Sequence, residues 1–140
     1  MIDKKFNLYL KIYLFCLFFF ATFFLFQKYN SISTWTISEW LINYQGGFTR
    51  RGFIGELVFH ISKFIPTTLR ETILILQLFS YIAYYYLIYK FLKNINKNLI
   101  IIFALLSPLF LIYPIAEVEV LGRKEIFIFI SFLIIANIFT

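Results

Sequence analysis

The chain has 140 residues, of which 61% are hydrophobic and 23% aromatic, whereas only 14% are charged. Soluble domains carry about 25% charged residues, and a soluble domain of this size leaves too much surface in water to bury 20 phenylalanines. The composition therefore argues against a soluble domain and predicts an all-α fold, a polytopic transmembrane helical bundle.

The net charge is +6, and the basic residues are scattered between apolar runs rather than gathered in one tract. This distribution is typical of topology signals and of contacts with anionic headgroups, so we expect membrane lipid, and no nucleic acid, as a partner. Other membrane proteins are a further class of expected partner. Cys16 is the single cysteine and indicates neither a disulfide framework nor a zinc site.

A charge-free apolar run over residues 12–26 follows a basic start. With its flanks it reaches the roughly 20 residues of a spanning helix, so we predict a first span over residues 8–28. A signal peptide is the alternative, because a basic start and an apolar run of this length are typical of one. The run ends in the bulky residues Phe24, Leu25, Phe26 and Gln27. They do not fit a cleavage site, which favours an uncleaved helix.

The long connection after the first span carries two predicted helices. Residues 34–44 include Trp35 and Trp40, and aromatic side chains of this kind concentrate at the membrane interface. Residues 52–65 repeat apolar side chains at helical spacing, and Pro66 ends the repeat. This second segment is too short and too charged to span, so we predict an amphipathic interfacial helix.

Three further spans are predicted, over residues 71–90, 98–116 and 126–140. A group of tyrosines near the end of the second span is typical of an interfacial belt: Tyr84, Tyr85, Tyr86 and Tyr89. The last run is too short for a full crossing, so we expect residues 1–140 to be one membrane domain from the N-terminal part of a longer protein, or a truncated reading frame.

The basic residues also predict an orientation. The two shortest connecting segments, the N-terminus and residues 90–97, are dense in lysine, which places both in the cytoplasm. Span parity then brings the long connection and residues 122–125 together on the outer face.

The first candidate site is the glycine-rich segment 43–56 around Arg50 and Arg51. Arginine suits bidentate binding of phosphate, glycine lets the backbone approach a ligand, and a helix beginning near Gly52 points its amides at the same place. We therefore predict that Arg50 and Arg51 bind phosphate or pyrophosphate. The alternative is that they anchor the loop to lipid headgroups.

Acidic residues in this connection are candidate catalytic groups. Glu56 and His60 lie four residues apart on one helix face, where a carboxylate beside an imidazole suits acid–base chemistry. A solvated helix face is the alternative, and two ligands are too few to predict a metal. Glu39, between two tryptophans, is a second candidate catalytic carboxylate or else a water-facing residue.

The second candidate site is a charged cluster after the third predicted span, residues 117–125. In the structural interpretation of this cluster, Glu119 and Arg123 form a favourable i,i+4 pair on a helix. In the functional interpretation, basic residues of this cluster join those of the first around an anionic group, and one glutamate acts as base. The predicted substrate-binding residues are then Arg50, Arg51, His60, Glu119, Arg123, Lys124 and Glu125.

The segments Gly46-Gly-Phe-Thr-Arg-Arg-Gly52, Gly55-Glu56 and Gly122-Arg-Lys-Glu125 together resemble a group of mostly uncharacterised bacterial polytopic membrane proteins linked with surface-polysaccharide synthesis. The predicted architecture is similar to that of GT-C glycosyltransferases. Those enzymes use polyprenyl-phosphate sugar donors and carry an essential acidic residue in the first outer loop, a place that Glu39 and Glu56 occupy here.

The resemblance implies an inner-membrane glycosyltransferase or polymerase, or a fragment of one, that handles a polyprenyl-(pyro)phosphate-linked sugar. The paired-acid motif that many such enzymes show does not occur in this sequence. The alternative is a non-enzymatic multi-pass protein, such as a transporter segment or an assembly subunit. The few polar residues inside the spans argue against a transport pathway.

Overall fold

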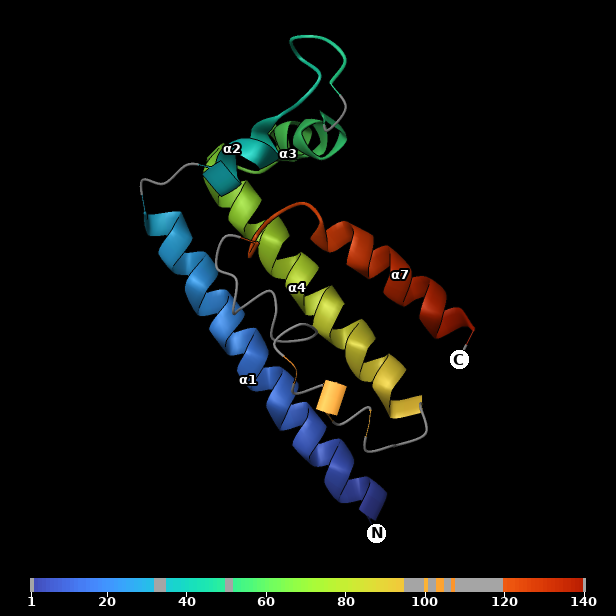
Figure 1. Ribbon diagram of the computed structural model, residues 1–140. Helices are drawn as coiled ribbons and strands as arrows, with labels where there is room; N and C mark the ends of the chain where they lie inside the picture. Colours follow the sequence, from blue (N-terminus) through green and yellow to red (C-terminus); the bar gives the residue numbers. More distant parts are fainter. Residues whose placement is uncertain are drawn as a thin grey trace.

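The computed structural model describes residues 2–31, 35–49, 52–94, 100, 103–104, 107 and 120–139 (Figure 1). The described residues form helices and their connections, with no strand among them. The labelled helices are α1 (Ile2–Asn30), α2 (Trp35–Leu41), α3 (Gly52–Phe64), α4 (Leu69–Asn94) and α7 (Ile126–Ile138). The prediction of an all-α protein is confirmed.

Two helices are long and apolar enough to span a membrane. The stretch Lys5–Asn30 of α1 has 26 residues and a mean hydropathy of 2.1, and α4 has 26 residues and a mean hydropathy of 1.5. A helix needs about 20 residues to cross the hydrocarbon core. α7 is also apolar but has only 13 residues. By length and composition, therefore, α1 and α4 could each cross a bilayer.

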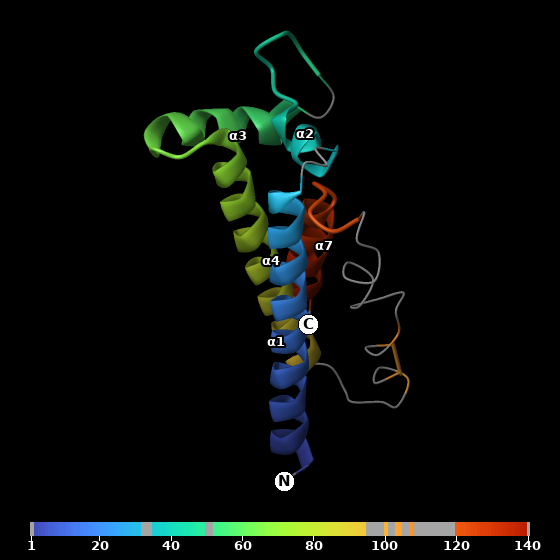
Figure 2. The same ribbon diagram turned by 90° about the vertical axis from the view of Figure 1, so that its left-hand side faces the viewer.

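α1 and α4 lie side by side, and their contact forms the main hydrophobic core (Figures 1 and 2). α1 buries a stripe at helical spacing, made of Leu10, Leu14, Leu17, Ala21 and Leu25. Facing it, α4 buries Tyr81, Tyr84, Tyr85, Ile88 and Leu92. The opposite side of α1 exposes Phe15, Phe19, Phe20, Phe23 and Phe26. A row of exposed phenylalanines of this kind suits a helix that faces lipid.

The prediction of an interfacial tyrosine belt is wrong for Tyr84 and Tyr85, which are buried. Both α1 and α7 pack against this part of α4. The ring of Tyr85 lies edge-on to that of Phe18, with centroids 6.2 Å apart, and the ring of Tyr84 lies 6.5 Å from that of Phe129. These tyrosines therefore pack helices together.

The end of α1 is joined to the beginning of α4 by Arg70. Its guanidinium donates hydrogen bonds to the backbone carbonyls of Tyr29 and Ser31, and it lies 5.1 Å from the centre of the Tyr29 ring. The last carbonyls of a helix have no partner within it, so Arg70 satisfies groups that α1 leaves open. Next to it, Thr68 and Glu71 exchange side chain–backbone hydrogen bonds that cap α4.

α2 and α3 lie across the end at which α4 begins (Figure 2). Trp40, Val58 and Ile73 form a second, smaller core between α2, α3 and α4. Trp40 is fully buried there, so its indole packs between helices instead of facing lipid. Close packing depends on Gly55, because a Cβ at this position would overlap the Ile42 carbonyl oxygen.

α4 and α7 both begin at this end of the molecule, so the two helices run in the same direction (Figure 1). α4 ends at Asn94, whereas the backbone of Gly122 is hydrogen-bonded to Gln77 and Tyr81 in the first half of α4. The predicted third span, residues 98–116, falls almost wholly outside the described residues.

Candidate functional site

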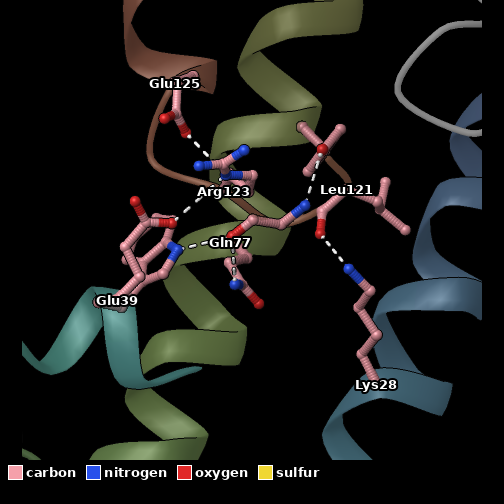
Figure 3. A network of polar contacts seen from close by, with 9 residues as sticks. Lys28, Glu39, Gln77, Leu121, Arg123 and Glu125 are labelled. Atoms are coloured by element: carbon pink, nitrogen blue, oxygen red, sulfur yellow. Dashed lines mark hydrogen bonds and ion pairs between the residues drawn. The ribbon is translucent and has the colours of Figure 1, made fainter. Parts of the chain in front are cut away.

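Side chains from three helices converge on the turn before α7, which we call the Gly122 turn (residues 120–125; Figure 3). The carbonyl oxygen of Gly122 accepts hydrogen bonds from Trp40 Nε1 at 2.6 Å and from Gln77 Nε2 at 2.8 Å. Its N–H donates to the Tyr81 hydroxyl at 3.1 Å. The φ of Gly122 is 83°, a backbone conformation that favours glycine.

α1 also contacts the Gly122 turn. Lys28 Nζ donates to the carbonyl oxygen of Leu121 at 2.8 Å, and the Leu121 side chain is fully buried. Buried backbone groups are costly unless they are hydrogen-bonded, and the turn obtains its partners from α1, α2 and α4. The Gly122 turn is therefore a fixed junction between these helices.

Charged side chains lie directly beside this junction. Arg123 Nε is 3.6 Å from Glu39 Oε2 and 3.5 Å from Glu125 Oε2 (Figure 3). The side chain of Glu39 is only 9% exposed, so it is not the water-facing residue of the alternative interpretation. Both separations exceed the 2.7–2.9 Å of a charge-assisted hydrogen bond, so the guanidinium is held loosely between the two carboxylates.

A second polar group lies on α3, where Glu56 accepts three hydrogen bonds. The donors are the Tyr44 backbone N–H at 3.1 Å, Gln45 Nε2 at 2.7 Å and His60 Nε2 at 3.1 Å. The bond from the Tyr44 backbone lowers the pKa of Glu56 below its usual value, and Gln45 and His60 act in the same direction. Glu56 is therefore a fixed, ionised hydrogen-bond acceptor rather than a proton acceptor near neutral pH.

An open groove of about 490 Å³ lies along this pair. We call it the α3 groove; it is lined by Tyr44, Phe53, Glu56, Leu57, His60, Ile61 and Phe64. Beside it, the rings of Tyr44 and Phe48 stack with centroids 5.6 Å apart, and Phe48 is 90% exposed. Apolar walls with a few polar groups at one place are typical of ligand sites.

The structure arranges the predicted site residues in two groups. Glu39, Arg123 and Glu125 form one group, with Lys124 half-buried in the same turn, whereas Glu56 and His60 form the other. Three further predicted site residues lie outside the described residues: Arg50, Arg51 and Glu119. Among the residues that are described, no three His, Cys, Asp or Glu side chains come together as metal ligands would.

Sequence reasoning missed the groups that position these residues, namely the backbone N–H of Tyr44 and the side chains of Lys28, Gln45, Gln77 and Tyr81. Gln77 did carry a signal, since an amide in an otherwise apolar helix needs a partner. The others are common at membrane boundaries or in polar loops, and nothing in the sequence singles them out.

Comparison with models of known protein families, with curated proteins and with solved structures finds no match to this chain.

Proposed function

We propose that the chain is a multi-pass inner-membrane protein of envelope glycan synthesis, with a cytoplasmic N-terminus, which handles a polyprenyl-(pyro)phosphate-linked sugar at the outer face. The observation that carries the proposal is the junction between Trp40 and Gly122. It joins the long connection to the second charged cluster, next to the last turn of α1 and the first half of α4, the two helices of membrane-spanning length. Charged and aromatic side chains thus gather where lipid headgroups and their sugars would lie.

The chemistry of the junction suits a phosphate. Arg123 is 35% exposed and faces two carboxylates at distances longer than good hydrogen bonds, so an incoming phosphate can compete for its guanidinium. Lys124 adds a second cation in the same turn. In this proposal Arg50 and Arg51 supply the fork-shaped donors that the sequence predicts, while Glu39 and Glu125 orient Arg123.

Reconstitution in phosphatidylcholine vesicles tests this function. Polyprenyl phosphate should raise the temperature of thermal unfolding in a saturable way, since a ligand that binds only the folded state stabilises it. Replacing Arg50 and Arg51 together with lysine keeps the charge but removes the fork, and should weaken binding by about tenfold or more. An equal response to phosphatidylglycerol at the same mole fraction would refute specific binding.

A second candidate is a non-enzymatic assembly subunit. It is favoured by one observation, the satisfaction of the buried Gly122 backbone groups by partners within the chain. In that case charge rather than geometry matters at Arg50 and Arg51, and the double lysine variant retains full function.

A further inference from the structure

The α3 groove contains a histidine whose orientation is fixed by a carboxylate. His60 is the single histidine of the chain, and its Nε2 lies 3.1 Å from Glu56 Oε1. Glu56 is itself fixed by the Tyr44 backbone and the Gln45 side chain, which belong to the preceding loop. The pair is therefore tied to two segments of the chain, unlike an i,i+4 pair on a free helix surface.

This contact determines which histidine nitrogen is available. A neutral imidazole has one N–H donor and one acceptor nitrogen. If Nε2 carries the hydrogen that faces Glu56, then Nδ1 has the lone pair and can accept a proton. A base oriented by a third group is the arrangement by which many enzymes activate a hydroxyl.

The surroundings of the pair indicate what kind of molecule the groove accepts. Phe53, Leu57 and Phe64 give it apolar walls, and they are 66%, 39% and 88% exposed. The stacked rings of Tyr44 and Phe48 add a flat aromatic face next to the polar pair, on which the apolar face of a sugar ring can pack. A ligand with an apolar tail and a hydroxyl-bearing ring would satisfy both parts of the groove.

We propose that the α3 groove binds the sugar of a membrane glycolipid, that His60 Nδ1 removes the proton from its acceptor hydroxyl, and that Glu56 positions His60. This inference rests on the proposed function, for which it supplies the acceptor site. The hydroxyl oxygen bonds to the anomeric carbon of the donor sugar as its proton passes to Nδ1. The bond from that carbon to the phosphate oxygen breaks, and polyprenyl phosphate leaves with the electron pair. The imidazolium then returns the proton to water.

The other charged and titratable groups near His60 are few among the described residues. Glu56 contacts it directly, and Tyr44 lines the same groove. Lys63 follows one turn later on α3, with its ammonium 4.1 Å from the centre of the Phe59 ring. The Glu56 carboxylate is therefore the charged group whose removal changes the tautomer of His60.

Nitrogen-15 NMR of the full chain in phosphatidylcholine bicelles tests the binding part, because a single histidine gives unambiguous imidazole signals. For the neutral imidazole, we expect the tautomer with hydrogen on Nε2. Hexyl glucoside should shift the Nδ1 resonance in a saturable way, whereas hexane should not. Glu56→Gln should give a mixture of tautomers, and Phe48→Ala should weaken the glucoside effect at least threefold.

A transfer assay tests the catalytic part, with polyprenyl-phosphate glucose as donor and hexyl glucoside as acceptor. Loss of a general base lowers rates by about 10²–10⁴-fold, so His60→Gln should reduce transfer about 100-fold or more. Polyprenyl phosphate binding should persist in this variant. Ser62→Ala, a change on the same helix at a side chain bonded to the Phe59 carbonyl, is the matched control and should leave transfer unchanged.

The two proposals fail in different ways. An Nδ1–H tautomer in the wild type, no saturable shift with hexyl glucoside, or unchanged transfer in His60→Gln overturns the acceptor site while leaving donor binding intact. If the wild type shows no specific binding of polyprenyl phosphate but does show the shift with hexyl glucoside, the donor assignment is overturned instead.

Discussion

Tyr81 offers the Gly122 turn one oxygen, which accepts the hydrogen bond from the Gly122 N–H. Tyr81→Phe removes that oxygen without opening a large cavity and leaves a buried N–H without its partner. An unsatisfied buried donor costs about 1–3 kcal/mol, so we expect the free energy of unfolding to fall by about that amount. Reversible unfolding in mixed micelles measures it. Tyr86→Phe is the control, because Tyr86 is 64% exposed and should change stability by less than about 0.5 kcal/mol.

The two carboxylates beside Arg123 differ in exposure, and this difference predicts unequal effects. Glu39 is 9% exposed and Glu125 is 37% exposed. Glu39→Gln weakens a pair that is partly shielded from water and should reduce the free energy of unfolding by about 1–3 kcal/mol. Glu125→Gln should cost only about 0–1 kcal/mol, as at an exposed pair. Equal losses in the same unfolding measurement would show that burial does not set the strength of these contacts.

At the scale of single residues, the sequence predicts which side chains belong to a site better than it predicts which side chains they contact. It identifies Glu39 and Arg123 as candidates, but the contact between them depends on how α2 meets the Gly122 turn. The prediction for Tyr85 is wrong for a related reason. A tyrosine in this part of a spanning helix can face the membrane boundary or pack against another helix. The partner helix decides between the two, and no pattern within α4 identifies it.

At the scale of elements, Gly55 sets how closely α3 approaches the chain after α2. A Cβ there would overlap the Ile42 carbonyl oxygen and lie 2.8 Å from the Trp40 carbonyl oxygen. Alanine favours a helix over glycine by about 1 kcal/mol, but overpacking against backbone costs about 1–3 kcal/mol or more. We therefore expect Gly55→Ala to be net destabilising in thermal unfolding. Gly46→Ala is the matched control, because its Cβ meets nothing within 4 Å.

The loop before α3 should loosen in acid, because it is bonded to Glu56. The pKa of Glu56 is lower in the folded protein than its usual 4.5, so the folded state favours the carboxylate. The contribution of ionised Glu56 to stability is therefore fully present above about pH 4.5. It is lost as the pH falls through the lower pKa that Glu56 has in the folded protein. Protection of the Tyr44 amide against hydrogen exchange, corrected for intrinsic exchange, should decline over that range.

Glu56→Gln provides the control for this acid dependence. A neutral amide does not titrate, so the decline in Tyr44 protection should vanish in this variant. A decline that persists there would assign the effect to another group.

Apolar periodicity predicts helices better than it predicts their packing. Residues 52–65 repeat apolar side chains at helical spacing, and α3 is Gly52–Phe64. The sequence predicts the preceding helix over residues 34–44, whereas α2 ends at Leu41. The core of Trp40, Val58 and Ile73 joins three helices, so no window of sequence contains the information that predicts it.

At the scale of the whole molecule, the sequence predicts that the long connection and residues 122–125 lie together, and the bond between Trp40 and Gly122 shows that they meet. The sequence does not predict that the polar side chains form two separate groups, one at the Gly122 turn and one in the α3 groove. Their separation depends on α3 lying across α4 rather than on composition (Figure 2).

The most direct test of the account is the labelling of single cysteines in sealed membrane vesicles with a membrane-impermeant thiol reagent, after replacement of Cys16 by serine. Gln45 belongs to the polar group around Glu56 and Lys124 to the Gly122 turn, whereas Lys93 lies in the last turn of α4. If α1 and α4 span the membrane, cysteines at positions 45 and 124 react from one side and a cysteine at 93 from the other. Labelling of all three from the same side would contradict a membrane-spanning α4 and, with it, the proposed site at the outer face.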